Sequence, residues 1–320
     1  MKVLITGATG LVGKSIAEIL LDKGVAVNYL TTRSEKIVSS KDFKGFYWNP
    51  AKSEIDLACF DGVSAVINLA GASIAKRWTE AYKEEVLSSR VNSLETLYNG
   101  LNEIDPSNIK TFVSASAVGI YPSSALQLYD EKETAVDDSF LGRVVKAWEN
   151  KIDTFNAFDF NLAKIRVGIV MAVNGGALPK MAKPIRYYMG AILGNGSQWQ
   201  SWIHINDLAQ MFVFVVENNL KGTFNGVAPN PVTGAKMTKA LAKTLKRPLW
   251  LLKIPQFAMQ TVLGEMSYLL FASQRVSSRR IEKKGFIFQY GNIGPALENL
   301  FLTKKKELDN KTEGLNKELV

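Results

Sequence analysis

A short apolar run followed by three evenly spaced glycines opens the chain. Residues 3–5, Val-Leu-Ile, predict a buried strand, and Gly7, Gly10 and Gly13 follow it at intervals of three. Apolar residues then return at helical spacing over residues 16–21. A strand, a glycine turn and a helix in this order predict a phosphate-binding turn, because glycines let the backbone approach a pyrophosphate and the free N–H groups at a helix start attract its charge. A glycine turn that binds no nucleotide is the alternative.

The end of the second predicted strand indicates which dinucleotide such a turn would bind. Residues 25–30 form an apolar, β-branched run, which leads into Thr31, Thr32, Arg33 and Ser34. An acidic residue at this place accepts a hydrogen bond from the 2′-hydroxyl of NAD, whereas an arginine accommodates the 2′-phosphate of NADP. Residues 25–34 contain Arg33 and no Asp or Glu. The sequence therefore favours NADP (NADPH), with a merely solvated arginine as the alternative.

Strands alternate with helices along the first half of the chain. We expect strands at residues 43–48, 65–69, 110–113 and 162–171, and helices at residues 78–102 and 140–155. Small residues follow two of these strands, at residues 68–71 and 114–117. Both segments would lie at the carboxyl edge of a parallel sheet, where ligands bind in open α/β folds. The alternation predicts an α/β fold with a Rossmann-type, doubly wound parallel sheet.

The second half is less regular and predicts a smaller, mainly C-terminal α+β substrate subdomain. Residues 175–181 form a loop that enters a helix. We expect further helices at residues 208–216, capped by Asn206 or Asp207, and at 234–246, 256–271, 277–284 and 294–301, with a short strand at 249–252. The 256–271 helix is apolar on most faces, so we expect it to be packed against the rest. The sequence predicts an NADP-binding Rossmann domain over residues 1–173, onto which residues 203–219 pack back. The substrate subdomain comprises residues 174–202 and 220–301. Residues 302–320 form a charged tail.

Composition excludes several classes of protein. The 320 residues are 47% apolar and 22% charged, which is typical of a soluble globular protein of one large or two smaller domains. The net charge of +9 predicts a solvated basic surface or a phosphate-bearing or acidic ligand, and no nucleic-acid motif accompanies it. The single Cys59 excludes an intrachain disulfide and fits a reducing compartment. No signal-peptide core or convincing membrane span occurs, so we expect a cytoplasmic protein that binds neither membrane nor nucleic acid.

The order of these segments resembles the extended short-chain dehydrogenase/reductases, also known as the nucleotide-sugar epimerase/dehydratase family. The glycine spacing is the Thr-Gly-x-x-Gly-x-x-Gly of that group. A narrower subgroup, the atypical "epimerase family" reductases, shares further segments with this chain. These are residues 68–71, 77–79, 89–90, 114–119, 148–149, 175–181, 198–199, 201–204, 207, 264–266 and 274–276. The resemblance covers residues 1–301.

The resemblance implies an NADP site at the glycine turn and at the carboxyl ends of three further strands. The residues assigned to the cofactor are Gly7, Thr9, Gly10, Leu11, Val12, Gly13, Arg33, Leu69, Ala70, Gly71, Ser114 and Ala115. No metal site is expected.

The catalytic pair of the larger family is missing from this chain. That family carries Tyr-x-x-x-Lys on the helix after the fifth strand, where the tyrosine is the acid/base, but no tyrosine here has a lysine four residues later. The subgroup is known for lacking the pair. The candidates that remain are Ser116, which matches the family's active-site serine and would donate to a substrate oxygen, Tyr121 and Lys180. We expect the single histidine, His204, to be structural, since it lies in a structural stretch of the family.

The resemblance implies an NADP-dependent oxidoreductase that acts on a carbonyl or alcohol of a small molecule. A non-catalytic NADP-binding protein with a sensor or regulatory role is the first alternative. The second, a nucleotide-sugar epimerase or dehydratase, is weakened because it needs reversible proton transfer at a hydroxyl, the task of the missing tyrosine. Family members often pair through the helices after the fourth and fifth strands, so a homodimer remains open.

Overall fold

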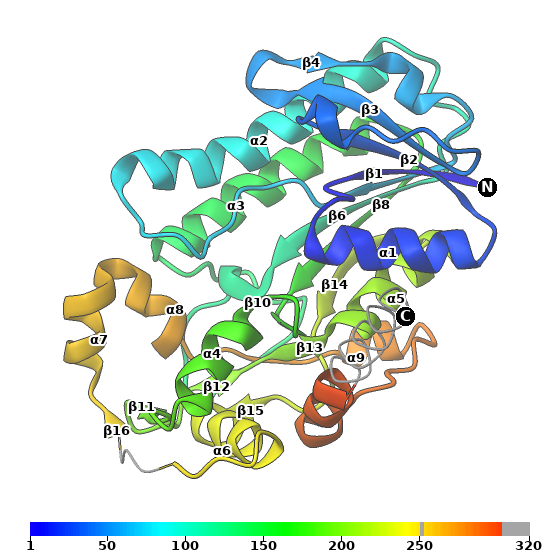
Figure 1. Ribbon diagram of the computed structural model, residues 1–320. Coiled ribbons are helices and arrows are strands. Elements are labelled where there is room, and N and C mark those ends of the chain that lie inside the picture. The colour runs from blue at the N-terminus through cyan, green and yellow to red at the C-terminus, as the bar shows by residue number, and fades with distance from the viewer. Residues whose placement is uncertain (250–252, 303–320) are drawn as a thin grey trace.

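The computed structural model describes residues 1–249 and 253–302, and an eight-stranded sheet lies at its centre (Figure 1). In spatial order the strands are β14 (Gly222–Gly226), β8 (Asn161–Val167), β6 (Thr111–Ala117), β5 (Ala65–Asn68), β1 (Lys2–Thr6), β2 (Ala26–Thr31), β3 (Phe43–Asn49) and β4 (Glu54–Ile55). All neighbours are parallel except β3 and β4, which are antiparallel. The strand order reverses between β1 and β5, and ligands bind at the carboxyl edge of such a switch point. The predicted doubly wound α/β fold is confirmed.

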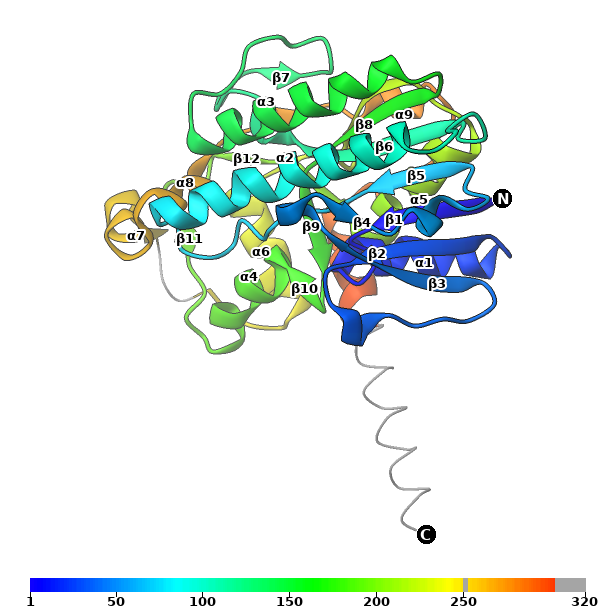
Figure 2. The ribbon, with the colours of Figure 1, turned by 90° about the horizontal axis from the view of Figure 1, so that it is seen from above.

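Helices cover both faces of this sheet (Figure 2). Helices α1 (Leu11–Asp22) and α5 (Ile205–Glu217) bury apolar residues against one face. Helices α2 (Glu80–Asn102) and α3 (Phe140–Asp153) do so on the other. The N-caps of α2 and α3 are Thr79 and Ser139, whose side chains accept hydrogen bonds from the backbone N–H groups of the first turn.

A second, smaller body follows β8 and is built from short elements around its own apolar core. A three-stranded sheet contains β10 (Gly175–Gly176), β9 (Ile169–Ala172) and β13 (Trp202–His204). Two-stranded pairs join β11 (Ile192–Leu193) to β16 (Lys253–Ile254), β12 (Trp199–Gln200) to β15 (Val232–Thr233), and β7 (Leu128–Tyr129) to β17 (Arg275–Val276). The helices that follow are α4 (Ala177–Arg186), α6 (Gly234–Thr244), α7 (Gln256–Leu263) and α8 (Tyr268–Phe271), and residues 293–302 are also helical. Helix α9 (Arg279–Glu282) instead packs its Ile281 into the core of the central sheet. The exact division into domains stays a prediction.

Two element predictions in this region are wrong. The strand expected at residues 162–171 is two strands, because Gly168 separates β8 from β9. A Cβ at Gly168 would lie 2.4 Å from the Ser201 carbonyl oxygen, so the chain turns there against a neighbouring backbone. Helix α5 is capped by His204 and not by Asn206 or Asp207.

The helix expected at residues 256–271 is also wrong, both in length and in burial. It breaks at Gly264, whose φ of +58° is a left-handed conformation that glycine adopts without strain. Helix α7 buries none of its residues, and Phe257 and Val262 are each 70% exposed. The helix expected at 277–284 is confined to α9. Residues 250–252 of the expected 249–252 strand, and 303–320 of the expected tail, lie outside the described residues.

Candidate functional site

The glycine turn leaves the start of α1 open. Gly10 is the N-cap of α1 and offers no side chain to its first turn, so the N–H groups there receive no side-chain cap. Gly7 has a φ of +72°, and its carbonyl oxygen accepts a hydrogen bond from the Gly10 N–H at 2.9 Å. A Cβ at Gly13 would lie 2.2 Å from that same oxygen. The turn is therefore held tightly by glycine packing, and its unpaired donors suit an anion.

Thr6, the last residue of β1, joins this turn to the end of β5. Its hydroxyl oxygen accepts hydrogen bonds from the N–H groups of Leu69 at 3.0 Å and Ala70 at 3.1 Å, and its hydroxyl donates to Asn68 Oδ1 at 2.7 Å. Asn68 Nδ2 in turn donates to Ser114 Oγ at 2.9 Å. Thr6, Asn68 and Ser114 thus tie the carboxyl ends of β1 and β5 to the middle of β6.

The predicted cofactor residues meet at this edge of the sheet. A Cβ at Gly7 would lie 3.3 Å from the Leu69 carbonyl group, so the glycine turn and the 69–71 turn are in direct contact. Arg33 follows β2, the strand next to β1, and its side chain is exposed. It makes no ion pair with any described residue, which leaves its charge available for an anion.

The segment that enters α4 and the first turn of α4 contact both the start of α1 and the chain that follows the 69–71 turn. Just before α4, a Cβ at Gly175 would lie 3.2 Å from the Leu11 side chain at the start of α1. One turn into the helix, Lys180 Nζ donates a hydrogen bond to the Ala75 carbonyl oxygen at 3.0 Å, in the segment that follows the 69–71 turn. Lys180 is exposed, so its ammonium group is accessible beside the segment that follows the 69–71 turn.

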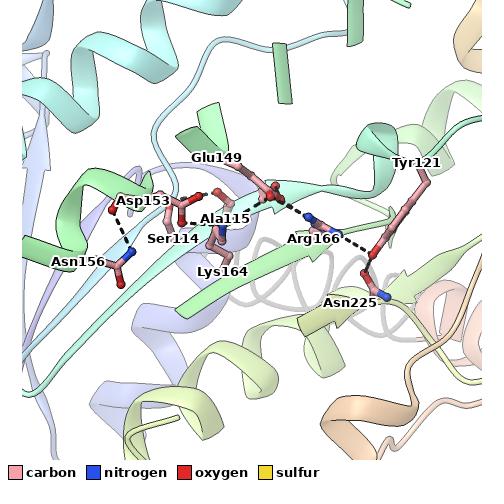
Figure 3. Close-up of polar contacts among 10 residues, drawn as sticks. Ser114, Ala115, Tyr121, Glu149, Asp153, Asn156, Lys164, Arg166 and Asn225 are labelled. Carbon is pink, nitrogen blue, oxygen red and sulfur yellow. Dashed lines mark hydrogen bonds and ion pairs between the residues drawn. The ribbon is translucent and has the colours of Figure 1, made fainter. Parts of the chain in front are cut away.

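The predicted catalytic residues Ser116 and Tyr121 belong to one buried polar network. Figure 3 shows the part of it that runs from Glu149 through Arg166 to Tyr121 and Asn225. Glu149, on α3, accepts hydrogen bonds from Ser116 Oγ at 2.6 Å and from Arg166 Nε and Nη2 at 2.8 Å each. Arg166 Nη1 donates to the Tyr121 hydroxyl oxygen at 2.9 Å, and that hydroxyl donates to Asn225 Oδ1 at 2.8 Å. The network joins α3 to β6, β8 and β14.

The direction of the Ser116 hydrogen bond follows from the charge on Glu149. Burial alone would raise the pKa of Glu149, but the hydrogen bonds and charge of Arg166, aided by Ser116 and Lys164, outweigh it and lower the pKa. An ionised carboxylate only accepts hydrogen bonds, so the Ser116 hydroxyl donates a hydrogen bond to Glu149. Only the lone pairs of its oxygen are then available to other groups. Ser116 is also only 2% exposed. In this structure the Ser116 hydroxyl is bound to Glu149, and its role toward a substrate oxygen stays a prediction.

The Tyr121 hydroxyl is likewise hydrogen-bonded to other groups of the protein. The Tyr121 side chain is fully buried, and burial raises the pKa of its phenol to about 12, a rise that the charge of Arg166 and the bonds to Arg166 and Asn225 only partly offset. A phenol with this pKa stays protonated near neutrality, and its side chain has no exposed surface. The catalytic role expected for Tyr121 stays a prediction.

Apolar side chains occupy the face of α3 where an acid/base pair would stand. Leu141 and Val145 precede Glu149 at intervals of four and lie over Gly119, whose Cβ would meet Leu141 Cβ at 3.7 Å and Val145 Cγ2 at 4.0 Å. This ridge faces the end of β6. This face of α3 thus carries apolar side chains and no tyrosine–lysine pair, as the missing Tyr-x-x-x-Lys pattern predicts.

A cleft of about 730 Å³ lies between the start of α3 and the α7–α8 segment. Its walls include Trp78, Phe140, Arg143, Gln260, Glu265 and Tyr268. Lys83 Nζ lies 2.6 Å from Glu265 Oε2, so an ion pair joins α2 to the segment that closes the cleft. The cleft combines aromatic walls with polar groups, as ligand pockets usually do.

The structure places His204, Trp199 and Trp202 in contacts within the protein. His204 is buried, its Nδ1 accepts a hydrogen bond from the Asn206 N–H at 3.1 Å, and its ring stacks on Tyr290. Burial lowers its pKa to about 4, so the imidazole is neutral. Trp202 is fully buried and donates to the Asn230 carbonyl oxygen, whereas Trp199 is half-buried and donates to the Ala125 carbonyl oxygen.

Sequence reasoning missed Arg90 and Trp148 as groups that border the 69–71 turn. Arg90 Cζ lies 5.0 Å from the centre of the Trp148 ring, and a Cβ at Gly71 would lie 3.1 Å from the same Cζ atom. Both residues occur in segments that support the family resemblance. Their place in those segments was the only signal in the sequence that could have indicated this contact.

Neither a membrane-spanning helix nor a metal site is found in the parts of the chain that the structure describes. No helix over residues 1–249 and 253–302 is both long enough and apolar enough to cross a bilayer. Within the same ranges, His, Cys, Asp and Glu side chains form no group of three or more suited to a metal ion.

Known proteins are similar to this chain in sequence and in fold. Residues 3–141 match the model of the NAD dependent epimerase/dehydratase family, and residues 254–300 match a domain of unknown function. Epimerase family protein SAR0825 of Staphylococcus aureus is 36% identical over 300 residues, which are 93% of this chain and 98% of that protein. The structure of human epimerase family protein SDR39U1 (isoform 2) with NADPH has a TM-score of 0.80 and 28% identity, and the match covers 94% of this chain and 99% of that one. UDP-N-acetylglucosamine 4-epimerase from Bacillus cereus shares the fold, with a TM-score of 0.73 at 18% identity over 95% of this chain and 96% of its own.

Proposed function

Since the chain belongs to the NAD-dependent epimerase/dehydratase family of extended short-chain dehydrogenase/reductases, we propose that it is an NADP-dependent oxidoreductase acting on a small molecule. The reaction is reduction of a carbonyl or oxidation of an alcohol. The observation that carries the proposal is the uncapped start of α1, which lies between the exposed Arg33 and the 69–71 turn at the switch point of the sheet. The relative SDR39U1, solved with NADPH, supports the choice of NADP.

The residues of the chain fit such a cofactor. The glycine turn provides close backbone approach and unpaired N–H groups for the pyrophosphate, and Arg33 provides a positive charge for the 2′-phosphate. The Thr6 bonds to Leu69 and Ala70 hold the opposite wall of the crevice in place. The cleft beside α3 is the proposed substrate pocket; Lys180 does not line this cleft, but it bonds to Ala75, three residues before the wall residue Trp78.

Lys180 is the proposed proton donor to the substrate oxygen. When bound, NADPH supplies the hydride to the carbonyl carbon, and the oxygen then needs a proton. Of the predicted candidates Ser116, Tyr121 and Lys180, only Lys180 is exposed. One ammonium N–H donates to the Ala75 carbonyl oxygen, which orients the group and leaves two N–H donors for the substrate.

The test is loss of NADPH absorbance during a screen of aldehydes and ketones, first with the wild-type chain. Lys180→Ala should lower kcat by about 100-fold and leave NADPH binding unchanged, since general acid catalysis is worth about that much. Lys180→Arg keeps a cation and should retain part of the activity. Lys183→Ala, an exposed lysine on the same helix, is the matched control. Equal activity in Lys180→Ala and Lys183→Ala would remove Lys180 from the mechanism.

A specific observation favours a second candidate, an NADP-binding protein without turnover. The hydroxyls of Ser116 and Tyr121 are bound to protein groups, and Leu141 and Val145 stand where acid/base chemistry is usually placed. Tight NADPH binding with no consumption across the whole screen would favour this role. Failure to bind either dinucleotide would overturn both candidates.

A further inference from the structure

Arg90, on α2, is a partly buried cation that lacks a negatively charged partner among the described residues. Its Nη1 and Nη2 donate to the carbonyl oxygens of Val86 at 2.7 Å and Ala72 at 3.1 Å, and both acceptors are neutral. It forms no ion pair with any residue of the described ranges. Burial lowers the pKa of its guanidinium to about 10, which reflects the cost of holding this charge away from water. A positive charge kept here at such a cost needs an explanation.

Packing holds the guanidinium against the 69–71 turn. The Trp148 ring lies on one side of it, with Arg90 Cζ 5.0 Å from the ring centre. Gly71 lies on another side, and the Cβ of any other residue there would be 3.1 Å from Arg90 Cζ and 3.2 Å from its Cγ. Trp148 is 5% exposed, and its Nε1–H has no acceptor among the described residues. The pocket around Arg90 thus holds a charge and an unused donor, with no acid.

The order of the strands sets where this charge lies along the crevice. Arg33 follows β2, the glycine turn follows β1, and the 69–71 turn that contacts Arg90 follows β5. These three strands are consecutive in the sheet, in the order β5, β1, β2. Arg33 and Arg90 therefore flank the glycine turn from opposite sides. If Arg33 takes the 2′-phosphate, Arg90 borders the nicotinamide half of the dinucleotide.

We propose that Arg90 is a second anion-binding residue of the dinucleotide site and pairs with the phosphate of the nicotinamide half. Trp148 is its positioning residue. This assignment rests on the proposed binding of NADPH. It divides recognition of the cofactor between two arginines, one for each half. It also explains why a partly buried arginine lies beside a glycine that leaves room for it, and why this arginine forms no ion pair with a described residue.

Binding of two ligands by calorimetry tests this assignment. NADPH carries both halves, whereas adenosine 2′,5′-bisphosphate lacks the nicotinamide-side phosphate. Arg90→Gln should weaken NADPH binding by about 10- to 100-fold, as expected for loss of a charge-assisted hydrogen bond, and leave adenosine 2′,5′-bisphosphate binding unchanged. Arg90→Lys should recover part of the loss. Trp148→Phe, which keeps an aromatic ring, should weaken NADPH binding less than Arg90→Gln does.

The control is Arg279→Gln, which removes one exposed positive charge from α9 and should not change either affinity. Melting temperatures of all variants show whether each is folded. Unchanged NADPH binding in Arg90→Gln would overturn the assignment, and so would equal weakening of both ligands. A loss of affinity seen only for an anionic substrate in the ternary complex would also overturn the assignment. It would indicate that Arg90 binds the substrate and not the cofactor. A wild-type chain that binds no NADPH would instead overturn the proposed function.

Discussion

Ser116 Oγ lies 2.6 Å from Glu149 Oε1, and the serine is the donor in this hydrogen bond. The carboxylate also accepts two hydrogen bonds from Arg166, so its charge is compensated inside the protein. A serine at the position of an active-site serine thus serves to complete a buried ion pair. The pair fastens α3 to the sheet at the end of β6.

Glu149→Gln should therefore destabilise the protein more than Ser116→Ala. The glutamine leaves Arg166 buried without a counter-ion, which costs about 3 kcal/mol or more. The alanine removes one hydrogen bond and leaves the ion pair, which costs about 1.5–3 kcal/mol. The free energy of unfolding in urea measures both. A Glu149→Gln change below about 0.5 kcal/mol would show that the ion pair is not needed for stability.

Glu149 should also contribute to the acid sensitivity of the fold. Its pKa is lower in the folded chain than its ordinary value of 4.5, so its contribution to stability is present above that value and is lost as the pH falls through the folded pKa. Glu149→Gln should accordingly show a flatter decline of stability below pH 4.5 than the wild-type chain. Parallel declines of the two in urea titrations at several pH values would contradict this.

Gly13→Ala should abolish NADPH binding and lower stability. The new Cβ would lie 2.2 Å from the Gly7 carbonyl oxygen and 2.7 Å from Ala8 Cα, which are backbone atoms that cannot move without opening the turn. Gly294→Ala is the control, because no atom lies within 4 Å of its Cβ. Calorimetric titration with NADPH and a melting curve distinguish the two. A Gly13→Ala variant that binds NADPH normally would show that the turn is not the cofactor site.

Arg33→Ala should weaken binding of NADPH by about tenfold or more and change that of NADH by much less. The exposed side chain has no ion-pair partner among the described residues, so its removal takes away only a contact with the 2′-phosphate. Fluorescence titration with both reduced dinucleotides measures the ratio. Equal losses for NADPH and NADH would contradict the role of Arg33.

His204 should make the fold less stable between pH 6.5 and 4. Burial lowers the pKa of His204 from 6.5 to about 4, so over this range the unfolded chain binds a proton that the folded chain does not. Stability should fall by as much as about 3 kcal/mol as the pH drops through this window. His204→Asn keeps a good helix N-cap and has no titrating group, so its stability should vary less there. A wild-type curve that is flat between pH 6.5 and 4 would contradict the prediction.

Much of the α/β framework was predictable because its signals are local. The glycine turn and the apolar runs of the first half predicted β1, α1, β2, β3, β5 and β6 close to their observed places. Failures came where packing between distant segments decided the outcome. The turn at Gly168 depends on the backbone of Ser201, and the exposure of Phe257 on α7 depends on what lies nearby in space. An apolar helix in the sequence does not reveal whether a neighbour covers it.

The sequence by itself determined the fold class, the position of the glycine turn and the absence of the usual acid/base pair, since each follows from residue types at short, regular spacing. Only the tertiary structure decided what Ser116, Tyr121, Lys180 and Arg90 do. Ser116 donates a hydrogen bond to Glu149, 33 positions away, and Tyr121 donates one to Asn225, 104 positions away. Lys180, by contrast, is exposed. A polar side chain acquires its protonation state and its free donors from the groups that surround it after folding, and no spacing in the chain specifies those groups.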